Sequence, residues 1–441
     1  MVTTGKMLAM NPGTLDRKKA GFSFFWLCAF YTIYCARPED WLHVIAILPL
    51  AKIAGVGAFL AFLLSARKGK RSLRDLPAES YYLLVLIGLL FLSAIFSPIW
   101  RGGALSHTIN FAKVYVVWIL TFLLLTDLDK FRRLLFIQAA SVPAICLLSM
   151  IKGRGHSRLD SVLGGIYSNP NDLAFAIVLS LPICLMFLLS TRSAMRKLLW
   201  TAAILVMATA LVMTASRGGF ITLIVAGVVC LWHFGVKGRR FYLIVGSACA
   251  GVVLLAVAGG TMKERFVTLW ADDINSREQA RAAGSLEQRK ELNDRALQGI
   301  REYPILGIGA QNFETYSGSW HEVHMTYLQV GVEAGVPALI VYLIFFGLGF
   351  RNLRRLLRRR DLDPQLKLAV WALHSSLVGF AVGASFSPEA YQFFPFFTVA
   401  YTSALFAIVR EKDTALAAEA QAVRAAAENS YVREDRVPVN T

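Results

Sequence analysis

The sequence predicts an all-α polytopic membrane protein with about twelve transmembrane helices and one larger helical loop. Its composition is the first reason: 56% of the 441 residues are hydrophobic and 17% are charged, whereas a soluble protein carries about 25% charged residues. The second reason is that apolar residues form long uninterrupted runs, close to the ~20 residues that a helix needs to cross the hydrocarbon core. The third is that positive charge is concentrated in alternate loops.

The apolar runs define the expected spans. Their length favours helices over buried strands, which are much shorter. They cover residues 20–36, 41–64, 81–99, 109–126, 132–151, 171–190, 198–214, 218–234, 241–258, 325–350, 367–386 and 392–409.

Loop charges give these spans a direction. Lys and Arg collect after the even-numbered spans, as in RKGKRSLR after 41–64 and RNLRRLLRRR after 325–350. Cytoplasmic loops of membrane proteins carry this excess of positive charge. We therefore expect both termini in the cytoplasm. The net charge of +17 then reflects topology, and no nucleic-acid partner is expected.

The spans and loops divide the chain into four expected parts. Residues 1–258 hold the first nine spans, 259–324 form a loop subdomain outside the cytoplasm, 325–410 hold the last three spans, and 411–441 form a cytoplasmic tail. Within the loop, residues 287–301 have an amphipathic helical pattern that ends at Tyr303-Pro304. The Ala- and Glu-rich tail predicts a helix that frays at its end.

Arginines on the outward side depart from the charge rule. A guanidinium at a span end can reach lipid phosphate, which accounts for most of them. Arg217 is different because it lies in a short Ser-Arg-Gly-Gly turn, where glycines allow close backbone approach. Its fork of donors matches two phosphate oxygens at once. We favour a phosphate-binding role over lipid-headgroup anchoring.

Two histidines and an acid mark the start of the span 325–350. His324 has a usual pKa near 6.5, so it can act as a base at ambient pH, although a structural hydrogen-bonding role is the alternative. His321 shares its face if the helix extends that far back. Glu333 lies inside the span and needs a partner or a water-filled cavity.

Other polar residues interrupt or open spans. In Asn169-Pro170-Asn171-Asp172, which opens the span 171–190, Asn171 or Asp172 is expected to cap the helix, and a role in the site is the alternative. Four further residues should face the bundle interior because charge and polarity are costly against lipid. They are His43, Lys52, Lys113 and His374.

No metal or cofactor is expected. The six cysteines lie in or at the ends of apolar runs without C-x-x-C spacing, which suggests neither a disulfide framework nor a metal site. No cluster of carboxylates forms an evident metal site, and no nucleotide-binding loop is present.

Three motifs resemble the O-antigen ligase and polymerase superfamily of bacterial cell envelopes. The first is SNPNDLAFAIVLSLP (168–182), similar to an Asn-Pro-Asn-x-Leu-Ala helix start. The second is TASRGGFITLIVAG (214–227), which carries the Ser-Arg-Gly-Gly turn. The third combines Arg289, the turn Pro304–Phe313 and the stretch His324–Pro337. In this chain, Met follows the histidine where the family has Asn.

The resemblance implies a GT-C-like glycosyltransferase of the bacterial inner membrane. Such enzymes transfer a glycan from undecaprenyl diphosphate to an acceptor hydroxyl on lipid A–core, on the periplasmic side. The reaction uses neither a metal nor a nucleotide sugar, and direct displacement inverts the anomeric configuration. The expected partners are the lipid-linked glycan donor, a lipid A–core or other glycan acceptor, and the bilayer.

The same resemblance implies roles for residues. His324 is the expected general base, and Arg217 and Arg289 are expected to neutralise the diphosphate leaving group. Further residues are expected to contact the substrates. They are His321, Arg154, Arg158, Asn169, Asn171 and Glu333.

Three other functions stay open from the sequence. A polymerase of the same superfamily would transfer the glycan to another lipid-linked glycan, and a protein O-glycan ligase would transfer it to protein. A transporter or flippase would bind an anionic substrate with the same arginines. That class predicts inverted repeats with broken helices, and the sequence shows no internal repeat.

Overall fold

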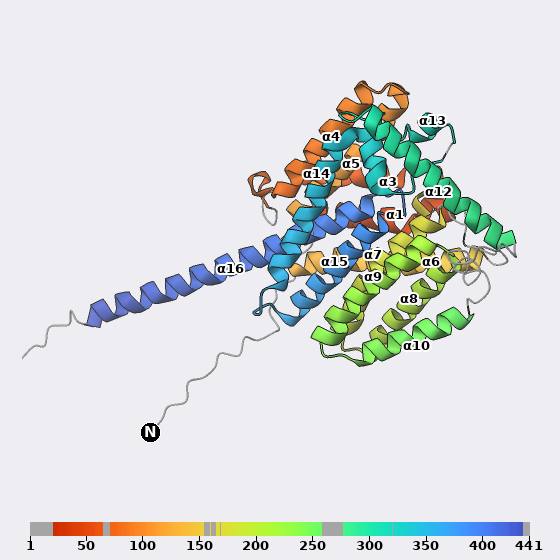
Figure 1. Ribbon diagram of the computed structural model, residues 1–441. Coiled ribbons are helices and arrows are strands. Elements are labelled where there is room, and N and C mark those ends of the chain that lie inside the picture. Colours follow the sequence, from red (N-terminus) through yellow and green to blue (C-terminus); the bar gives the residue numbers. More distant parts are fainter. Residues whose placement is uncertain are drawn as a thin grey trace, which may run out of the picture.

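Helices account for all the regular structure in the computed structural model, which describes residues 21–64, 71–153, 159, 165–167, 169–257, 277–319 and 321–434. Nine helices within these residues are long and apolar enough to cross a membrane (Figure 1). They are α4 (Ala78–Ile95), α5 (Arg101–Leu124), α6 (Leu128–Lys152), α7 (Pro170–Ser190), α8 (Ala194–Met213), α9 (Arg217–Cys230) with its π-helical continuation η4 (Leu231–Lys237), α14 (Thr326–Leu357), α15 (Pro364–Gly383) and α16 (Phe393–Glu434). Three shorter apolar helices accompany them: α1 (Phe22–Ala36), α3 (Leu50–Leu64) and α10 (Tyr242–Val257).

Each expected span coincides with one of these helices, so the all-helical polytopic fold is confirmed. The second span is shorter than the sequence suggested. Residues 41–64 hold the end of α2 (Pro38–Trp41), the turn η1 (His43–Ile45) and then α3. Pro49 immediately precedes α3, and a proline has no N–H to continue a helix from the preceding turn. The apolar run is therefore continuous in sequence but broken in structure.

Short polar side chains set where several helices begin. The Asp127 carboxylate accepts from the Lys130 N–H at 2.9 Å and caps α6. The Asp363 carboxylate accepts from the Gln365 N–H at 2.8 Å and caps α15. Each cap satisfies a backbone donor that has no partner within the helix.

Glycines allow α7, α9 and α15 to pack closely. A Cβ on Gly383 of α15 would lie 2.6 Å from the Phe175 ring of α7, and a Cβ on Gly379 would lie 3.0 Å from Val178 and 3.2 Å from Ala226 of α9. Small residues let the backbones of membrane helices approach and gain van der Waals contact. The starts of α7 and α9 are thereby held against the end of α15.

α14 contains a break at Gly335, whose φ is +85° and ψ is 167°. In an uninterrupted helix, the N–H of Val336 would bond to the carbonyl of Val332. Pro337 has no N–H to offer to the carbonyl of Glu333. The break and the proline together leave two buried carbonyl groups without helical partners.

Residues 304–309, which lie before α14 in the sequence, supply those partners. The N–H groups of Ile308 and Gly309 donate to the carbonyls of Val332 and Glu333, both at 2.9 Å, and the carbonyl of Pro304 accepts from Val336 N–H at 2.8 Å. Ser93 Oγ of α4 also donates to the Glu333 carbonyl, at 2.6 Å. The Pro304–Phe313 motif is therefore a structural joint that fits into the break of α14.

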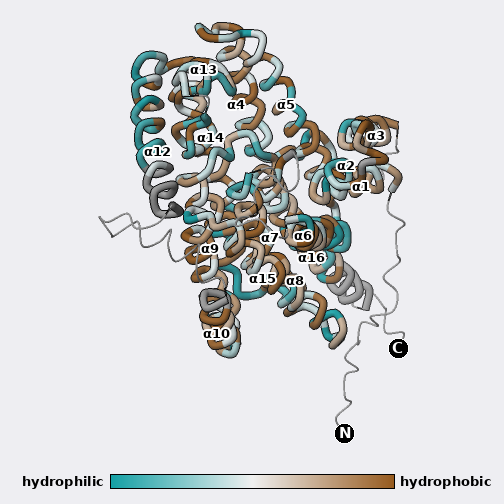
Figure 2. Tube along the Cα trace, turned by 90° about the vertical axis from the view of Figure 1, so that its right-hand side faces the viewer, coloured by the Kyte–Doolittle hydropathy of each residue, from teal (hydrophilic) through white to brown (hydrophobic). Residues whose placement is uncertain are grey.

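The segment between α10 and α14 contains α12 (Arg277–Glu302) and α13 (Phe313–Ser317). The predicted amphipathic helix is confirmed and ends one residue before Tyr303. Figure 2 shows α12 as a largely hydrophilic helix beside the apolar bundle. Its buried side joins α13 and α14 in a second apolar cluster, made of Leu292, Ala296, Ile308, Phe313, Val323 and Val332.

Two lysines do not face the interior as expected. Lys52 and Lys113 are exposed, and Lys113 Nζ donates to Asn110 Oδ1 of its own helix at 2.6 Å. A long side chain can place its ammonium away from the backbone and find a local partner, which the sequence pattern did not reveal. His374 meets the expectation: its Nδ1 lies 3.1 Å from Nε2 of the buried His233.

Candidate functional site

The residues predicted to act together come from helix starts, loops and α12 at one end of the bundle, where α5, α7, α9, α14 and α16 begin. We call this the site end. The backbone N–H of Thr326, the first residue of α14, donates to the Ala384 carbonyl at 2.7 Å, and its hydroxyl donates to the Ser387 carbonyl at 2.7 Å. The same hydroxyl accepts from Glu389 N–H at 2.9 Å. The start of α14 is therefore fixed to the loop between α15 and α16.

His324 lies two residues before α14 and is half-buried. Burial, then the positive charge of Arg289, then that of His321 together lower the pKa of His324 to about 4. The imidazole is therefore neutral at ambient pH and able to accept a proton. Its Nδ1 is buried and has no hydrogen-bond partner among the described residues.

Arg289 reaches this environment from α12. It is half-buried, one turn before Leu292 on the side of the helix that packs against the second apolar cluster. Its charge is the second cause of the lowered pKa of His324. The charge of Arg289 therefore acts on a histidine that lies 35 positions later in the sequence.

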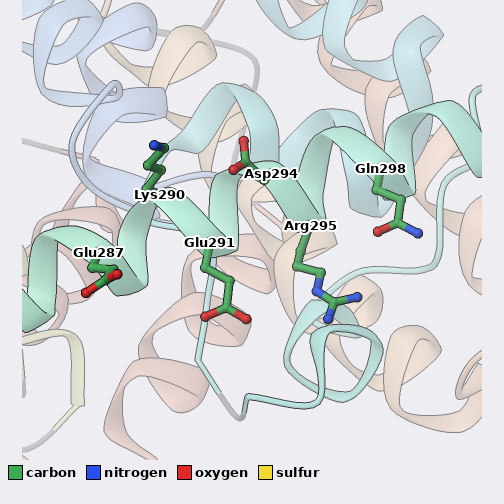
Figure 3. Close-up of a pocket in the computed structure, with 6 residues that line it drawn as sticks. All are labelled: Glu287, Lys290, Glu291, Asp294, Arg295 and Gln298. Atoms are coloured by element: carbon green, nitrogen blue, oxygen red, sulfur yellow. The ribbon is translucent and has the colours of Figure 1, made fainter.

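The opposite side of α12 is a separate surface. Figure 3 shows a shallow open depression along it, lined by Glu287, Lys290, Glu291, Asp294, Arg295 and Gln298. All six residues belong to one helix and carry mixed charges, and none was predicted as a site residue. The buried side of α12 carries Arg289, whose charge acts on the base candidate His324. That side is therefore the better candidate for catalysis.

Arg217 is the first residue of α9 and is half-buried. Ser216 caps the helix: its Oγ accepts from Gly219 N–H at 3.0 Å and donates to Asn171 Oδ1 of α7 at 2.7 Å. A Cβ on Gly218 would lie 2.7 Å from Cβ of Phe386. The glycines therefore allow close approach, as expected, and hold the Arg217 turn against α7 and the loop after α15.

The loop 384–392 contacts both halves of the candidate site. Its Phe386 packs on the turn that carries Arg217, and its Ala384 and Ser387 bind the helix start that follows His324. The arginine turn and the histidine are thus held at the site end by one common loop.

Carboxyl groups near this loop were missed by sequence reasoning. Glu389 is 2% exposed and accepts from Ser387 Oγ at 2.8 Å; burial raises the pKa of Glu389 well above its usual range, and the carboxylate of Asp172 raises it further. Burial likewise raises the pKa of Glu322, which accepts from Gln311 Nε2 at 3.0 Å. These acids lie in short loops, where the sequence has no periodicity that would predict which residues come close in the fold.

Glu333 has the partner that its position requires. The hydroxyl of Tyr391 donates to Glu333 Oε2 at 2.6 Å, and Glu333 is 2% exposed. The residue also carries the carbonyl that holds the joint of α14. A structural role accounts for both groups of Glu333.

Asn169 and Asn171 lie at the start of α7, and His321 lies in the loop before α14. Asn169 caps α7, because its Oδ1 accepts from Asn171 N–H at 2.9 Å; the expectation that Asn171 or Asp172 is the cap was wrong, since Pro170 occupies the first helical position. His321 is exposed, and its Nδ1 bonds to the Ser319 carbonyl.

The residues before α14 do not extend that helix. α14 begins at Thr326, and Met325 is extended, so His321 does not share a helical face with His324. Arg154 and Arg158 lie outside the described residues.

A comparison with curated proteins finds no match. A family model described as O-antigen ligase matches residues 202–343. The matched region includes Arg217, Arg289, His324 and the joint of α14. By this match, residues 202–343 of the chain are similar to the O-antigen ligase family.

Proposed function

We propose that the protein is a glycosyltransferase that transfers a glycan from undecaprenyl diphosphate to a hydroxyl of lipid A–core. The observation that carries the proposal is the electrostatic effect of Arg289 on the neutral imidazole of His324, beside the loop that also holds the Arg217 turn. This arrangement supplies a base for the acceptor and positive charge for a diphosphate. No nucleotide or metal has a part in the proposed reaction.

The proposed reaction is a direct displacement. The acceptor oxygen attacks the anomeric carbon and loses its proton to His324, while the bond from that carbon to the diphosphate oxygen breaks. A positioned base contributes about 10²–10⁴-fold in such steps. Arg217 and Arg289 bind the departing diphosphate, whose charge grows in the transition state. Attack from the opposite side inverts the anomeric configuration.

A bound donor also changes the basicity of His324. Arg289 lowers the pKa of His324 in the protein alone, and an anionic diphosphate beside that arginine would offset its charge. The pKa of His324 then rises when donor binds, which makes the imidazole a stronger base at the moment it is needed.

The orientation follows from the basic loops. We place the site end in the periplasm, both termini in the cytoplasm and the protein in the bacterial inner membrane. The segments 1–258 and 325–410 form the membrane part, 259–324 the periplasmic part and 411–441 the tail. His321, Asn169 and Asn171 are proposed to line the substrate region, together with Arg154 and Arg158.

The test is transfer by the purified protein in proteoliposomes with a defined undecaprenyl-diphosphate glycan. Two acceptors are supplied separately, lipid A–core and a second lipid-linked glycan. We expect product only on lipid A–core, and loss of transfer by His324→Ala. The matched control is His107→Ala, which changes an exposed histidine of α5.

Other outcomes of the transfer assay would point to a different base or a different function. Full transfer by the His324→Ala variant excludes it as the base. Product on the lipid-linked glycan alone identifies a polymerase, and donor movement across the bilayer without any transfer identifies a flippase.

A further inference from the structure

The last helix continues far beyond the membrane bundle. α16 starts at the site end, fills the core with its first half and leaves the bundle at the opposite end (Figure 1). From Thr414 to Arg424, every side chain is exposed. The part from Thr414 to Glu434 is about 30 Å long at the helical rise of 1.5 Å per residue.

Two ion pairs fix the direction in which this extension leaves. The guanidinium of Arg71 donates through Nε to Glu411 Oε1 at 2.6 Å and through Nη2 to Glu411 Oε2 at 3.3 Å. Arg359 binds both carboxylate oxygens of Asp413. Paired donors of this kind specify geometry. The extension is therefore anchored at its base, and beyond it the described side chains from Ala415 to Arg424 are exposed.

The exposed part carries its large apolar residues on one stripe. Leu416 is 55% exposed and Val423 is 64% exposed, and they lie one heptad apart. Ala420 lies between them, so the three occupy successive d, a and d positions of a heptad pattern. An alanine at the central position allows two helices to approach closely.

The charges flanking this stripe complement each other between two copies of the chain. In this register Glu419 is a g position and Arg424 is the e position of the next heptad. In a parallel two-stranded coiled coil, a g residue faces the e residue five positions later on the partner. Glu419 would therefore face Arg424 of a second copy, and the two-fold symmetry makes the contact twice.

We propose that the segment Thr414–Arg424 pairs in parallel with the same segment of a second copy of this chain. Two copies in one membrane present their extensions in the same direction, which is the orientation that the charge pattern requires. The seam is short for a free coiled coil. Tethering in a membrane raises the effective concentration and offsets this weakness.

Disulfide cross-linking of the full chain in isolated membranes tests the pairing. The background is the chain with its exposed Cys249 replaced by Ala. Ala420→Cys lies on the seam, and Ala418→Cys, at the outward f position, is the matched control. Under mild oxidation we expect a cross-linked dimer from the seam variant and monomer from the control and from the background.

Charge reversal gives a second readout. Glu419→Arg alone, or Arg424→Glu alone, turns two attractive contacts into repulsive ones and should lower the cross-linked yield of the Ala420→Cys chain about tenfold. The double reversal restores both contacts and the yield. Equal cross-linking at positions 420 and 418, or none at 420, would overturn the proposal and assign the helix to another protein or to the lipid surface. Failure of the double reversal to restore the yield would overturn the parallel register.

Discussion

The hydroxyl of Tyr391 donates a 2.6 Å hydrogen bond to Oε2 of Glu333, across the contact between the loop after α15 and the break in α14. The same glutamate offers its backbone carbonyl to Gly309 N–H and to Ser93 Oγ. One buried residue therefore ties together α4, the turn before α13, α14 and the loop that borders the candidate site.

Removing this hydroxyl should weaken the fold. Tyr391→Phe removes one donor from the buried carboxyl, which keeps backbone hydrogen bonds from Gln311 and Phe313; the loss of a buried hydrogen bond costs about 1–3 kcal/mol. We expect Glu333→Gln to cost less, because an amide oxygen can still accept from Tyr391. Thermal unfolding of the detergent-solubilised variants measures both. Equal stability of Tyr391→Phe and the parent protein would contradict the structural role of the bond.

The break in α14 predicts a strong response at Gly335. A Cβ there would lie 2.2 Å from the Ile305 carbonyl oxygen, and a φ of +85° with a ψ of 167° is strained for any other residue by about 1–3 kcal/mol. Gly335→Ala should therefore reduce the yield of folded protein sharply. Gly347→Ala, in the same helix with no atom within 4 Å of its added Cβ, is the control and should be neutral or slightly stabilising. Size-exclusion chromatography in detergent compares the two.

Most of the helices could be predicted from the sequence because membrane crossing imposes a length and a composition on each one. The break between α2 and α3 was missed because hydropathy does not register the effect of Pro49. The Gly335 break was likewise invisible to periodicity. Its residues were visible only as a family motif, and the joint with Pro304–Phe313 depends on backbone contacts between segments about 30 positions apart.

The sequence indicated those candidate site residues whose charge is unusual for their side of the membrane. It did not indicate the acids that become buried only on folding. Arg217 and His324 stood out because positive and titratable groups are unusual on their side of a membrane protein, whereas Arg289 was singled out only by the family resemblance. Glu389 and Glu322 did not, since each is an ordinary acid in a short loop. Their significance arises only when folding buries them, Glu389 near Asp172 and Glu322 beside Gln311.

Close packing behind Arg217 predicts a local response in α9. Gly218→Ala adds a Cβ that would lie 2.7 Å from Cβ of Phe386, and overpacking of this kind costs about 1–3 kcal/mol. The Arg217 turn should move away from the loop, so the KM for the donor rises as well. Gly227→Ala in the same helix meets no atom within 4 Å and is the control. Thermal unfolding and donor titration test the pair, and unchanged stability and KM in Gly218→Ala would refute the close approach.

The arginine itself should be partly replaceable. Arg217→Ala removes the proposed diphosphate ligand, and we expect a loss of kcat/KM of about tenfold to a thousandfold, as for other groups that stabilise developing charge. Arg217→Lys keeps the charge but lacks the planar fork, so it should recover only part of the loss. Complete recovery by lysine would show that charge alone, without two-point binding, is sufficient. Transfer assays at varied donor concentration distinguish these results.

The lowered pKa of His324 predicts the pH dependence of transfer. Burial, then Arg289, then His321 hold this pKa at about 4, below the usual 6.5. A base must be neutral, so kcat/KM, which reports the free enzyme, should stay high down to about pH 5 and fall as the pH approaches 4. Arg289→Gln removes the second cause but leaves burial, so the acid limb should move toward higher pH without reaching 6.5. Arg295→Gln, on the outward side of α12, is the control and should leave the profile unchanged.

The position of the acid limb, rather than the absolute rate, is the readout, because Arg289 is also a proposed donor ligand. An acid limb of the parent protein near pH 6.5, or one that Arg289→Gln does not move, would contradict the electrostatic link between Arg289 and the base.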